Sequence, residues 1–318
     1  MAKKNISLTT SDITPENPQH CREVLEPWVF SSMPAKGFGW RLERFLDAFH
    51  WNKKIVKKSV KSLLSSQSRK LSDYRTAKHV KKTYNRTWSS VVWPHPRKPE
   101  TRKARSLAEW ENEGLVLTKE GLNQMQLERI MRVVELTKPA KVLEVGAGMG
   151  LNLLTLAAVF PDIEFAGIEL TEAGVERAKS VQEEEQLPDV IAAYSPYDIK
   201  DASAHRKIDF HNGDATNMPF EDNSFDLVYS RLAVEQMENV RDEAITEMAR
   251  VSRDAVLMVE PFADFNQDRH RNRAIKAKNY FSLFVDDMSR YGLKTQAVFG
   301  NWPQKLSEGI GLAYFKKQ

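Results

Sequence analysis

The apolar positions divide the chain into a polar first third and a remainder in which short strands alternate with amphipathic helices. Residues 163–168 form a short apolar run, and apolar residues at helical spacing occupy 122–136 before it. Pro139 and Pro161 stand between such segments, as proline does where a helix has ended. Alternation of strand and helix is typical of a parallel sheet with helices on both faces. We therefore expect an α/β fold built on a doubly wound, mostly parallel sheet.

The same pattern gives approximate bounds for the elements of this sheet. Seven strands are expected, at 141–145, 163–168, 207–211, 225–229, 255–260, 295–299 and 309–315. Helices are expected at 122–136, 151–160, 172–181, 240–251 and 274–291. The segment 187–206 is longer than the usual connection between a helix and a strand, so it either shapes a binding pocket or is a surface insertion.

A glycine-rich loop follows the first strand, where residues 141–150 read K-V-L-E-V-G-A-G-M-G. Glycine lets the backbone turn tightly and approach a ligand that a Cβ would obstruct. The second strand ends at Glu169, 19 residues after Gly150, and an acidic residue there can accept hydrogen bonds from both hydroxyls of a ribose. A dinucleotide site needs G-x-G-x-x-G/A, whereas Leu151 stands at the last of these positions. The loop therefore indicates a nucleoside-type ligand other than NAD.

On these residues the sequence resembles the class I S-adenosylmethionine-dependent methyltransferases with a methyltransferase-11-like domain, whose first motif is E/D-x-G-x-G-x-G. The resemblance continues through G-I-E-L (167–170), N-G-D-A (212–215), M-P-F (218–220) and S-F-D-L-V-Y-S (224–230) and covers residues 122–318. It implies a Rossmann-like methyltransferase fold and S-adenosylmethionine as the cofactor. The cofactor-binding residues that it implies are Glu144, Gly146, Ala147, Gly148, Gly150, Glu169, Leu170, Asp214, Ala215, Ser230 and Arg231. In this family the acidic residue at Asp214 accepts a hydrogen bond from the adenine amino group.

Methyl transfer needs an oriented acceptor and, where the nucleophile carries a proton, a general base. Three candidates for the base lie at or beyond the carboxyl ends of strands: Glu235, Glu260 and His270. The seven His residues and the single Cys21 show no zinc spacing, so no metal is expected. Residues 230–233 read S-R-L-A instead of the N/D-P-P-Y/F found in methyltransferases that act on amino groups of adenine or glutamine. By elimination we expect an oxygen acceptor on a small molecule, a sugar or a lipid-linked glycan.

Two other functions remain open at this point. The protein could be an RNA methyltransferase that docks through its basic N-terminal region, or a binding protein whose methyltransferase fold is inactive. The complete set of motif residues, including Glu144, Glu169 and Asp214, argues against the inactive form.

The net charge of +4 conceals a strong segregation along the chain. Residues 36–105 contain 20 Lys and Arg against four acidic residues, a net charge of +16, whereas residues 106–318 carry a net charge of −11. We therefore divide the chain into a flexible lead segment (1–35), a basic, largely helical extension with a Pro-rich linker (36–105), and a methyltransferase domain (106–318). Within the linker, prolines in 89–105 favour an extended, polyproline-like strand.

Residues 40–64 form a basic amphipathic helix by their spacing. Packing of its apolar face on the protein's own, oppositely charged domain is the favoured interpretation. Contact with an anionic membrane surface is the second, because aromatic residues beside a Lys-rich face are typical of interfacial helices. Nucleic-acid binding is the least favoured, with Tyr74, Tyr84, Trp88 and Trp93 available to stack on bases.

The absence of a long apolar run and of an apolar signal core, together with the single cysteine, predicts a cytoplasmic protein. It would either be free or lie peripherally at the inner membrane surface.

Overall fold

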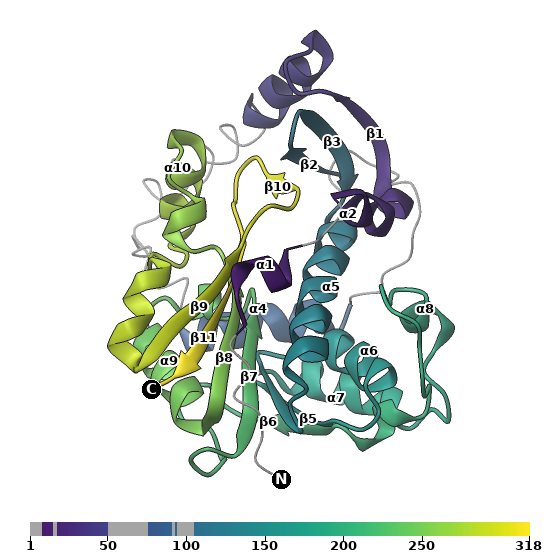
Figure 1. The fold of residues 1–318 in the computed structure, drawn as a ribbon, viewed down its shortest axis with the longest axis vertical. Coiled ribbons are helices and arrows are strands. Elements are labelled where there is room, and N and C mark those ends of the chain that lie inside the picture. Colours follow the sequence, from purple (N-terminus) through teal and green to yellow (C-terminus); the bar gives the residue numbers. More distant parts are fainter. Residues whose placement is uncertain (1–7, 15–17, 50–75, 91–92, 94–104) are drawn as a thin grey trace.

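The computed structural model describes residues 8–14, 18–49, 76–90, 93 and 105–318. Its centre is a seven-stranded sheet with the order β6-β5-β4-β7-β8-β11-β9 (Figure 1). The strands are β4 (Lys141–Val145), β5 (Glu164–Glu169), β6 (Asp209–Asn212), β7 (Phe225–Arg231), β8 (Ser252–Glu260), β9 (Leu293–Phe299) and β11 (Gly311–Lys317). The first five in this order pair in parallel, and β11 runs antiparallel to both β8 and β9. The expected doubly wound, mostly parallel sheet is confirmed.

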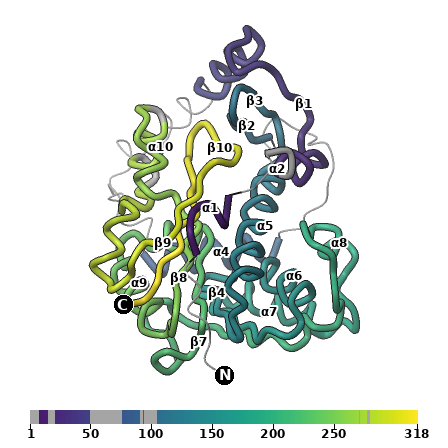
Figure 2. Tube along the Cα trace, in the orientation of Figure 1, coloured from purple at the N-terminus to yellow at the C-terminus, as the bar shows by residue number. Residues whose placement is uncertain are grey.

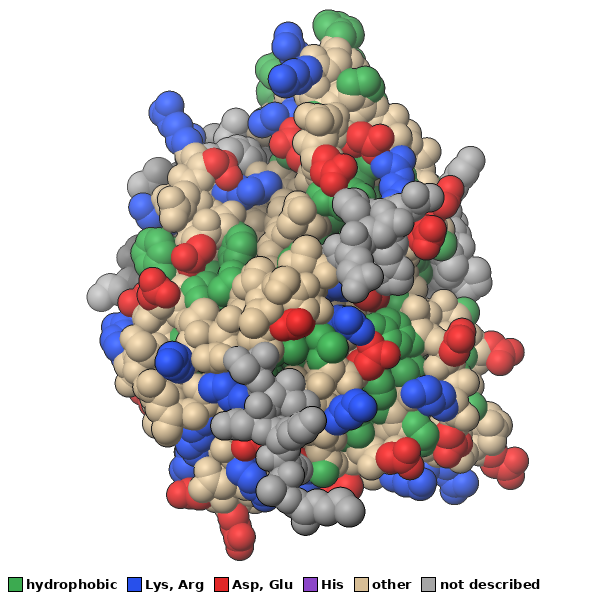
Figure 3. Space-filling view, viewed as in Figure 1, with side chains coloured by type: hydrophobic (Ala, Val, Ile, Leu, Met, Phe, Trp, Pro, Cys, Tyr) green, Lys and Arg blue, Asp and Glu red, His purple; other side chains and the backbone are tan. Residues whose placement is uncertain are grey.

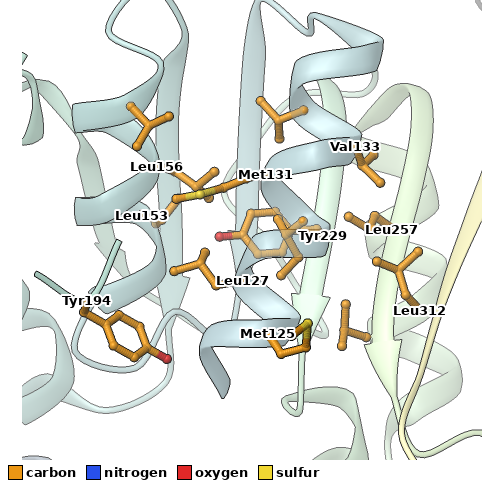
Figure 4. Close-up of a cluster of buried hydrophobic side chains, with 14 of the residues drawn as sticks. Met125, Leu127, Met131, Val133, Leu153, Leu156, Tyr194, Tyr229, Leu257 and Leu312 are labelled. Carbon is orange, nitrogen blue, oxygen red and sulfur yellow. The ribbon is translucent and has the colours of Figure 1, made fainter. Parts of the chain in front are cut away.

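Two apolar layers cover the sheet because successive residues of a strand point to opposite faces. In β7, Leu227 and Tyr229 belong to one buried cluster, and Val228 between them belongs to the other. The helices that contribute are α5 (Lys119–Thr137), α6 (Leu151–Val159) and α7 (Glu172–Gln182) in the first cluster, and α9 (Arg241–Val251) and η7 (Val285–Tyr291) in the second. Figure 4 shows Met131 of α5 and Leu153 of α6 around Tyr229. This packing fixes the strand ends that carry the site.

The expected helix over 274–291 is wrong, because two shorter elements stand in its place. These are α10 (Arg269–Lys278) and η7, and the chain between them is not helical. Asn279 ends the first with a left-handed φ of 51°, a conformation that Asn tolerates better than most residues. Phe281 and Leu283 are then buried in the second cluster, so packing rather than helical spacing determines their positions.

A small antiparallel sheet with the order β1-β3-β2-β10 was not predicted. Its strands are β1 (Val29–Pro34), β2 (Arg105–Trp110), β3 (Glu113–Thr118) and β10 (Gln304–Lys305). The strands β2 and β3 form a hairpin whose turn contains Glu111 at a φ of 53°. The first residues of the domain predicted from 106 thus pair both with the lead segment and with residues near the end of the chain.

The lead segment is not loosely packed over the residues that the structure describes. It contains α1 (Thr10–Ile13), α2 (Pro18–Leu25), η1 (Glu26–Trp28) and β1. Trp28 is buried, and its Nε1 donates a hydrogen bond of 2.5 Å to Gln124 of α5. Figure 2 shows α1 between β9 and α5, where Arg129 Nη1 donates to the carbonyl of Ile13 at 2.8 Å. A few apolar residues are enough to hold the lead segment on the domain, because each packs against residues that are distant in the sequence.

Residues 38–49 are helical, as expected, but their apolar face does not pack on the domain. Trp40 is buried, whereas Leu42, Phe45 and Phe49 are exposed. The favoured packing interpretation is therefore wrong for this part of the helix. The remainder of the predicted helix, 50–64, and most of the Pro-rich stretch, 94–104, lie outside the described residues.

Two further segments reach the site. The helix α4 (Ala77–Trp88) contacts α7. The long connection 187–206 contains α8 (Asp189–Ala192) and the start of η4 (Ala204–Lys207), and it buries Tyr194 against Trp28 with ring centroids 5.9 Å apart. The short helices η5 (Val234–Met237) and η6 (Ala263–Phe265) follow β7 and β8. Among the described residues no helix is both long enough and apolar enough to cross a bilayer.

Candidate functional site

A cavity of about 550 Å³ lies at the carboxyl ends of β4, β5 and β7. This is where open α/β sheets bind their ligands, at the point where the strand order reverses. Its wall contains most of the predicted cofactor-binding residues, namely Glu144, Gly146, Ala147, Gly148, Glu169, Leu170, Asp214, Ala215 and Arg231. The other two, Gly150 and Ser230, do not line it.

The glycine loop turns beneath this cavity in a conformation that requires glycine. Gly146 and Gly148 have φ values of 76° and 58°, which L-residues with a Cβ rarely adopt. A Cβ on Gly148 would also lie 2.9 Å from Trp88 Cζ2. Gly150 has a different role, because a Cβ there would lie 2.7 Å from Phe210 Cζ and so meet the core instead of the cavity.

The carboxylate of Glu169 is nearly buried and is held by three hydrogen bonds. Its Oε2 accepts from the backbone N of Gly148 at 2.9 Å, and its Oε1 accepts from the N and the hydroxyl of Thr171 at 3.0 and 2.6 Å. A carboxylate has about four acceptor sites. About one therefore remains for a ligand, and binding both hydroxyls of a ribose requires the loss of one bond to Thr171.

Asp214 lies in the turn after β6 and is exposed at the cavity wall. Its Oδ1 accepts hydrogen bonds from the backbone N and the hydroxyl of Thr216, both at 2.9 Å. These two bonds are the local turn chemistry of an Asx residue. They fix the orientation of the carboxylate beside the cavity.

Two oppositely charged groups lie close together on the β4–β7 side of the cavity. Glu144 is fully buried, and burial raises its pKa to about 7, although a hydrogen bond from Asn152 and the charge of Arg231 act in the opposite direction. Arg231 donates through Nε to Gln126 at 3.0 Å. Its Nη2 is buried without a hydrogen-bond partner in the described part of the chain. The pair presents one carboxylate and one guanidinium to a ligand.

Of the candidate bases whose side chains the structure describes, Glu235 lines the cavity and Glu260 does not. Glu235 belongs to η5, is largely buried, and its Oε1 accepts a 2.5 Å hydrogen bond from the side chain of Gln236. His270 lies in α10, and its side chain is outside the described residues.

Glu260 has a structural position instead of a catalytic one. It is fully buried, does not line the cavity, and accepts hydrogen bonds from the hydroxyl of Ser230 (2.9 Å) and the backbone N of Ala233 (3.1 Å), Val234 (3.1 Å) and Glu235 (3.2 Å). Burial nevertheless raises its pKa to about 7. The carboxyl group therefore fixes the start of η5 and with it Glu235. Ser230 is occupied by the same contact, which explains why it does not face the cavity.

The sequence analysis missed α4 as a part of the site. Tyr84 and Trp88, considered above for stacking on nucleic-acid bases, line the cavity with ring centroids 5.6 Å apart. The helix is held to the N-terminus of α7, where Asn85 Oδ1 accepts from Ala173 N at 3.2 Å and Lys81 pairs with Glu172 at 3.2 Å. The helical spacing of Val80, Tyr84 and Trp88 was the available signal, but nothing local indicates the surface it covers.

No group of three or more His, Cys, Asp or Glu side chains arranged for a metal occurs among the residues described.

Comparison with known proteins agrees with this geometry. Residues 143–259 match the family model described as a methyltransferase domain. Norajmaline N-methyltransferase from Rauvolfia serpentina is 27% identical over 179 residues, which cover 53% of this chain and 52% of that protein. A probable chloroplastic tocopherol O-methyltransferase from Oryza sativa subsp. japonica is 32% identical over 115 residues, covering 36% and 26%. The chain thus spans about half, or less, of the length of these relatives.

Solved structures share the fold at low identity. Magnesium protoporphyrin IX methyltransferase from Synechocystis PCC 6803, with bound SAH, has a TM-score of 0.52 at 11% identity and covers 76% of this chain and 99% of its own. The cyclase SpnF has a TM-score of 0.52 at 15% identity and covers 76% and 97%. Likeness at this level shows the fold alone, and function has to be argued from the site. Residues 143–259 thus match a methyltransferase domain, and the strand order and the glycine loop agree with the fold of the class I S-adenosylmethionine-dependent methyltransferases.

Proposed function

We propose that the protein transfers the methyl group of S-adenosylmethionine to an oxygen atom of a small, largely apolar molecule. The observation that carries this proposal is the make-up of a single cavity. Its wall contains the glycine loop and Glu169, the aromatic side chains of Tyr84 and Trp88 from α4, and the largely buried carboxylate of Glu235.

The cofactor half of the cavity fits the donor in its chemistry. Glu169 keeps about one acceptor site for a ribose hydroxyl, and the positive φ values of Gly146 and Gly148 turn the loop beneath the cavity. Glu144 and Arg231 offer opposite charges to the zwitterionic amino-acid end, and the buried, unpartnered Nη2 of Arg231 suits its carboxylate. When bound, S-adenosylmethionine supplies a methyl group that the positive sulfonium already activates.

The acceptor half favours an apolar molecule over a free sugar. Tyr84, Trp88, Leu232, Met237 and Val240 contribute apolar surface to the wall. Trp88 Nε1 is buried without an acceptor among the described residues, so a ligand oxygen can take its hydrogen bond. Glu235 would accept the proton of an acceptor hydroxyl as the carbon–oxygen bond forms.

Transfer to nitrogen is the second candidate, since norajmaline N-methyltransferase is among the relatives. The preference for an oxygen acceptor rests on two observations. Residues 230–233 read S-R-L-A and lack the N/D-P-P-Y/F pattern, and the carboxylate of Glu235 lines the cavity. Methylation of RNA receives less support. Tyr84 and Trp88, the aromatic residues considered for stacking on bases, form part of the cavity wall instead.

Cofactor binding is tested by isothermal titration of S-adenosylmethionine and its demethylated product. Glu169→Ala and Asp214→Ala should each weaken binding roughly five- to a hundredfold, the effect of losing a hydrogen bond worth ~1 to 3 kcal/mol. Ser180→Ala, an exposed site on α7, is the control and should bind normally. Unchanged affinity in both site variants would remove the assignment of the cofactor half.

The acceptor half is tested with cofactor carrying a labelled methyl group and a panel of phenols, alcohols and amines. Glu235→Gln should lower the turnover of an accepted hydroxyl compound by ~10² to 10⁴-fold, with cofactor affinity unchanged. Label found only on amine products would replace the oxygen proposal by nitrogen transfer.

A further inference from the structure

The helix at residues 38–49 carries a stripe of exposed apolar side chains. Of the five large apolar side chains that the described residues expose, four lie on it: Phe38 (82%), Leu42 (47%), Phe45 (66%) and Phe49 (61%). At 3.6 residues per turn these four positions fall within about 60° of one another around the helix axis. Single exposed apolar residues are ordinary, but an aligned set with three phenylalanines is typical of a surface that binds something.

The opposite side of the same helix is firmly attached to the small sheet. Trp40 is completely buried, and its Nε1 donates a 2.6 Å hydrogen bond to Glu109 of β2. Arg44 forms an ion pair with the same carboxylate at 2.9 Å. A Cβ on Gly114 of β3 would collide with the Trp40 ring, so the indole lies directly on the sheet. The exposed stripe is therefore presented in a fixed orientation, outward from the body of the protein.

Basic residues accompany this stripe. Lys36 and Arg41 are exposed on the described part, and residues 50–75, which follow the helix directly, contain eight Lys or Arg against the single acidic Asp73. Figure 1 shows residues 38–49 as the dark purple-blue helix at one extreme of the molecule, and Figure 3 shows apolar and basic side chains together at that end. An apolar stripe beside an excess of positive charge is complementary to a surface whose outer layer is anionic and whose deeper layer is apolar.

We propose that the stripe Phe38, Leu42, Phe45 and Phe49 docks the protein on the surface of an anionic phospholipid bilayer. The phenylalanines enter the boundary between head groups and acyl chains, and the exposed Lys36 and Arg41 bind the anionic head groups. Charge selects this occupant over a protein partner, since the net charge of residues 36–105 is +16. The docking does not depend on the proposed methyl transfer, and it concerns a different surface from the cavity.

Co-sedimentation of the full-length protein with vesicles tests the proposal. Wild type should bind vesicles of equal parts phosphatidylglycerol and phosphatidylcholine, bind pure phosphatidylcholine far less, and be released as salt shortens the Debye length from ~14 Å at about 50 mM to ~3 Å at about 1 M. The double variant Phe45→Ser/Phe49→Ser should bind at least about tenfold more weakly, or ~1.4 kcal/mol. Phe284→Ser removes an exposed phenylalanine elsewhere and is the matched control, which should bind like wild type.

Melting temperature and sedimentation velocity complete the experiment. Melting temperatures equal to that of wild type in both variants would support the proposal, because the removed side chains are exposed. A wild type that does not sediment with phosphatidylglycerol vesicles would overturn it. A clear loss of thermal stability in the double variant would also overturn it, because the stripe would then belong to the protein's own packing. A dimeric wild type and a monomeric double variant would overturn it as well, because the stripe would then mediate self-association.

Discussion

Replacing Glu260 by Gln should destabilise the protein in a way that depends on pH. The wild-type carboxyl group accepts four hydrogen bonds, one of them from the hydroxyl of Ser230 and three from backbone N–H groups at the start of η5. A Gln keeps one oxygen but turns an amide nitrogen toward one of these donors. One bond is lost and a buried N–H is left unpaired, which typically costs ~1 to 3 kcal/mol.

The pH dependence follows from the raised pKa of Glu260, which burial moves from 4.5 to about 7. A raised pKa means that the contribution of this group to folding is greatest below about pH 4.5 and is lost as the pH rises through about 7. At 1.36 kcal/mol per pH unit, ionising Glu260 in the folded protein costs on the order of 3 kcal/mol more than in the unfolded chain. The Gln variant has no such group. The stability advantage of wild type over the variant should therefore fall by on the order of 3 kcal/mol from pH 5 to pH 9, so that the variant is equally or more stable at the upper end of this range.

Urea unfolding at intervals between pH 5 and pH 9, followed by circular dichroism, measures both quantities. Glu144 titrates in the same range but is present in both proteins, so its contribution cancels. Glu176→Gln, an exposed change on α7, should match wild type at every pH. A difference that stays constant from pH 5 to pH 9 would show that the four donors keep Glu260 ionised throughout, and the reasoning from burial would be refuted.

Two more outcomes are expected. Affinity for S-adenosylmethionine should rise as the pH increases through about 7, because Glu144, whose pKa burial raises to about 7, must ionise to face a cationic ligand; titration calorimetry should find no such rise in Glu144→Gln. Trp28→Ala should lower the free energy of unfolding by ~3 to 5 kcal/mol, as truncation of a buried aromatic does, since Trp28 is 1% exposed and bonded to Gln124; urea unfolding of full-length protein measures this, and a loss below ~1 kcal/mol would contradict the docking of the lead segment.

The sheet and the part of the cavity wall at its strand ends could be predicted because their signals are local. The run K-V-L-E-V and the three glycines after it predict a strand, a tight turn and a ligand-binding loop within ten residues. Glu169 ends β5 and Asp214 follows β6, so their place at the same sheet edge follows from parallel pairing alone.

The errors concern residues whose position depends on distant partners. Glu260 is a carboxyl group at the carboxyl end of a strand, as a catalytic base would be. Its structural role is visible only from the backbone N–H groups at the start of η5, about 25 residues earlier, which donate to it. In the sequence, Trp28 is an isolated aromatic residue in a polar segment. Only the fold brings it beside its hydrogen-bond partner Gln124, 96 residues away. The stripe on residues 38–49 has the spacing of a core-facing helix, and spacing cannot tell a buried face from an exposed one.

The placement of α1 has a consequence for the order in which the protein is made. The strand β9 is an edge of the large sheet, and α1 contacts it, with Val298 N donating a 3.1 Å hydrogen bond to the hydroxyl of Thr10. Exposed sheet edges recruit other chains. Thr10 is synthesised 288 positions before its partner Val298, a delay of roughly 15 to 60 s at ordinary synthesis rates. The helix α1 is therefore already synthesised when β9 appears, and it covers this edge strand once the sheet has formed.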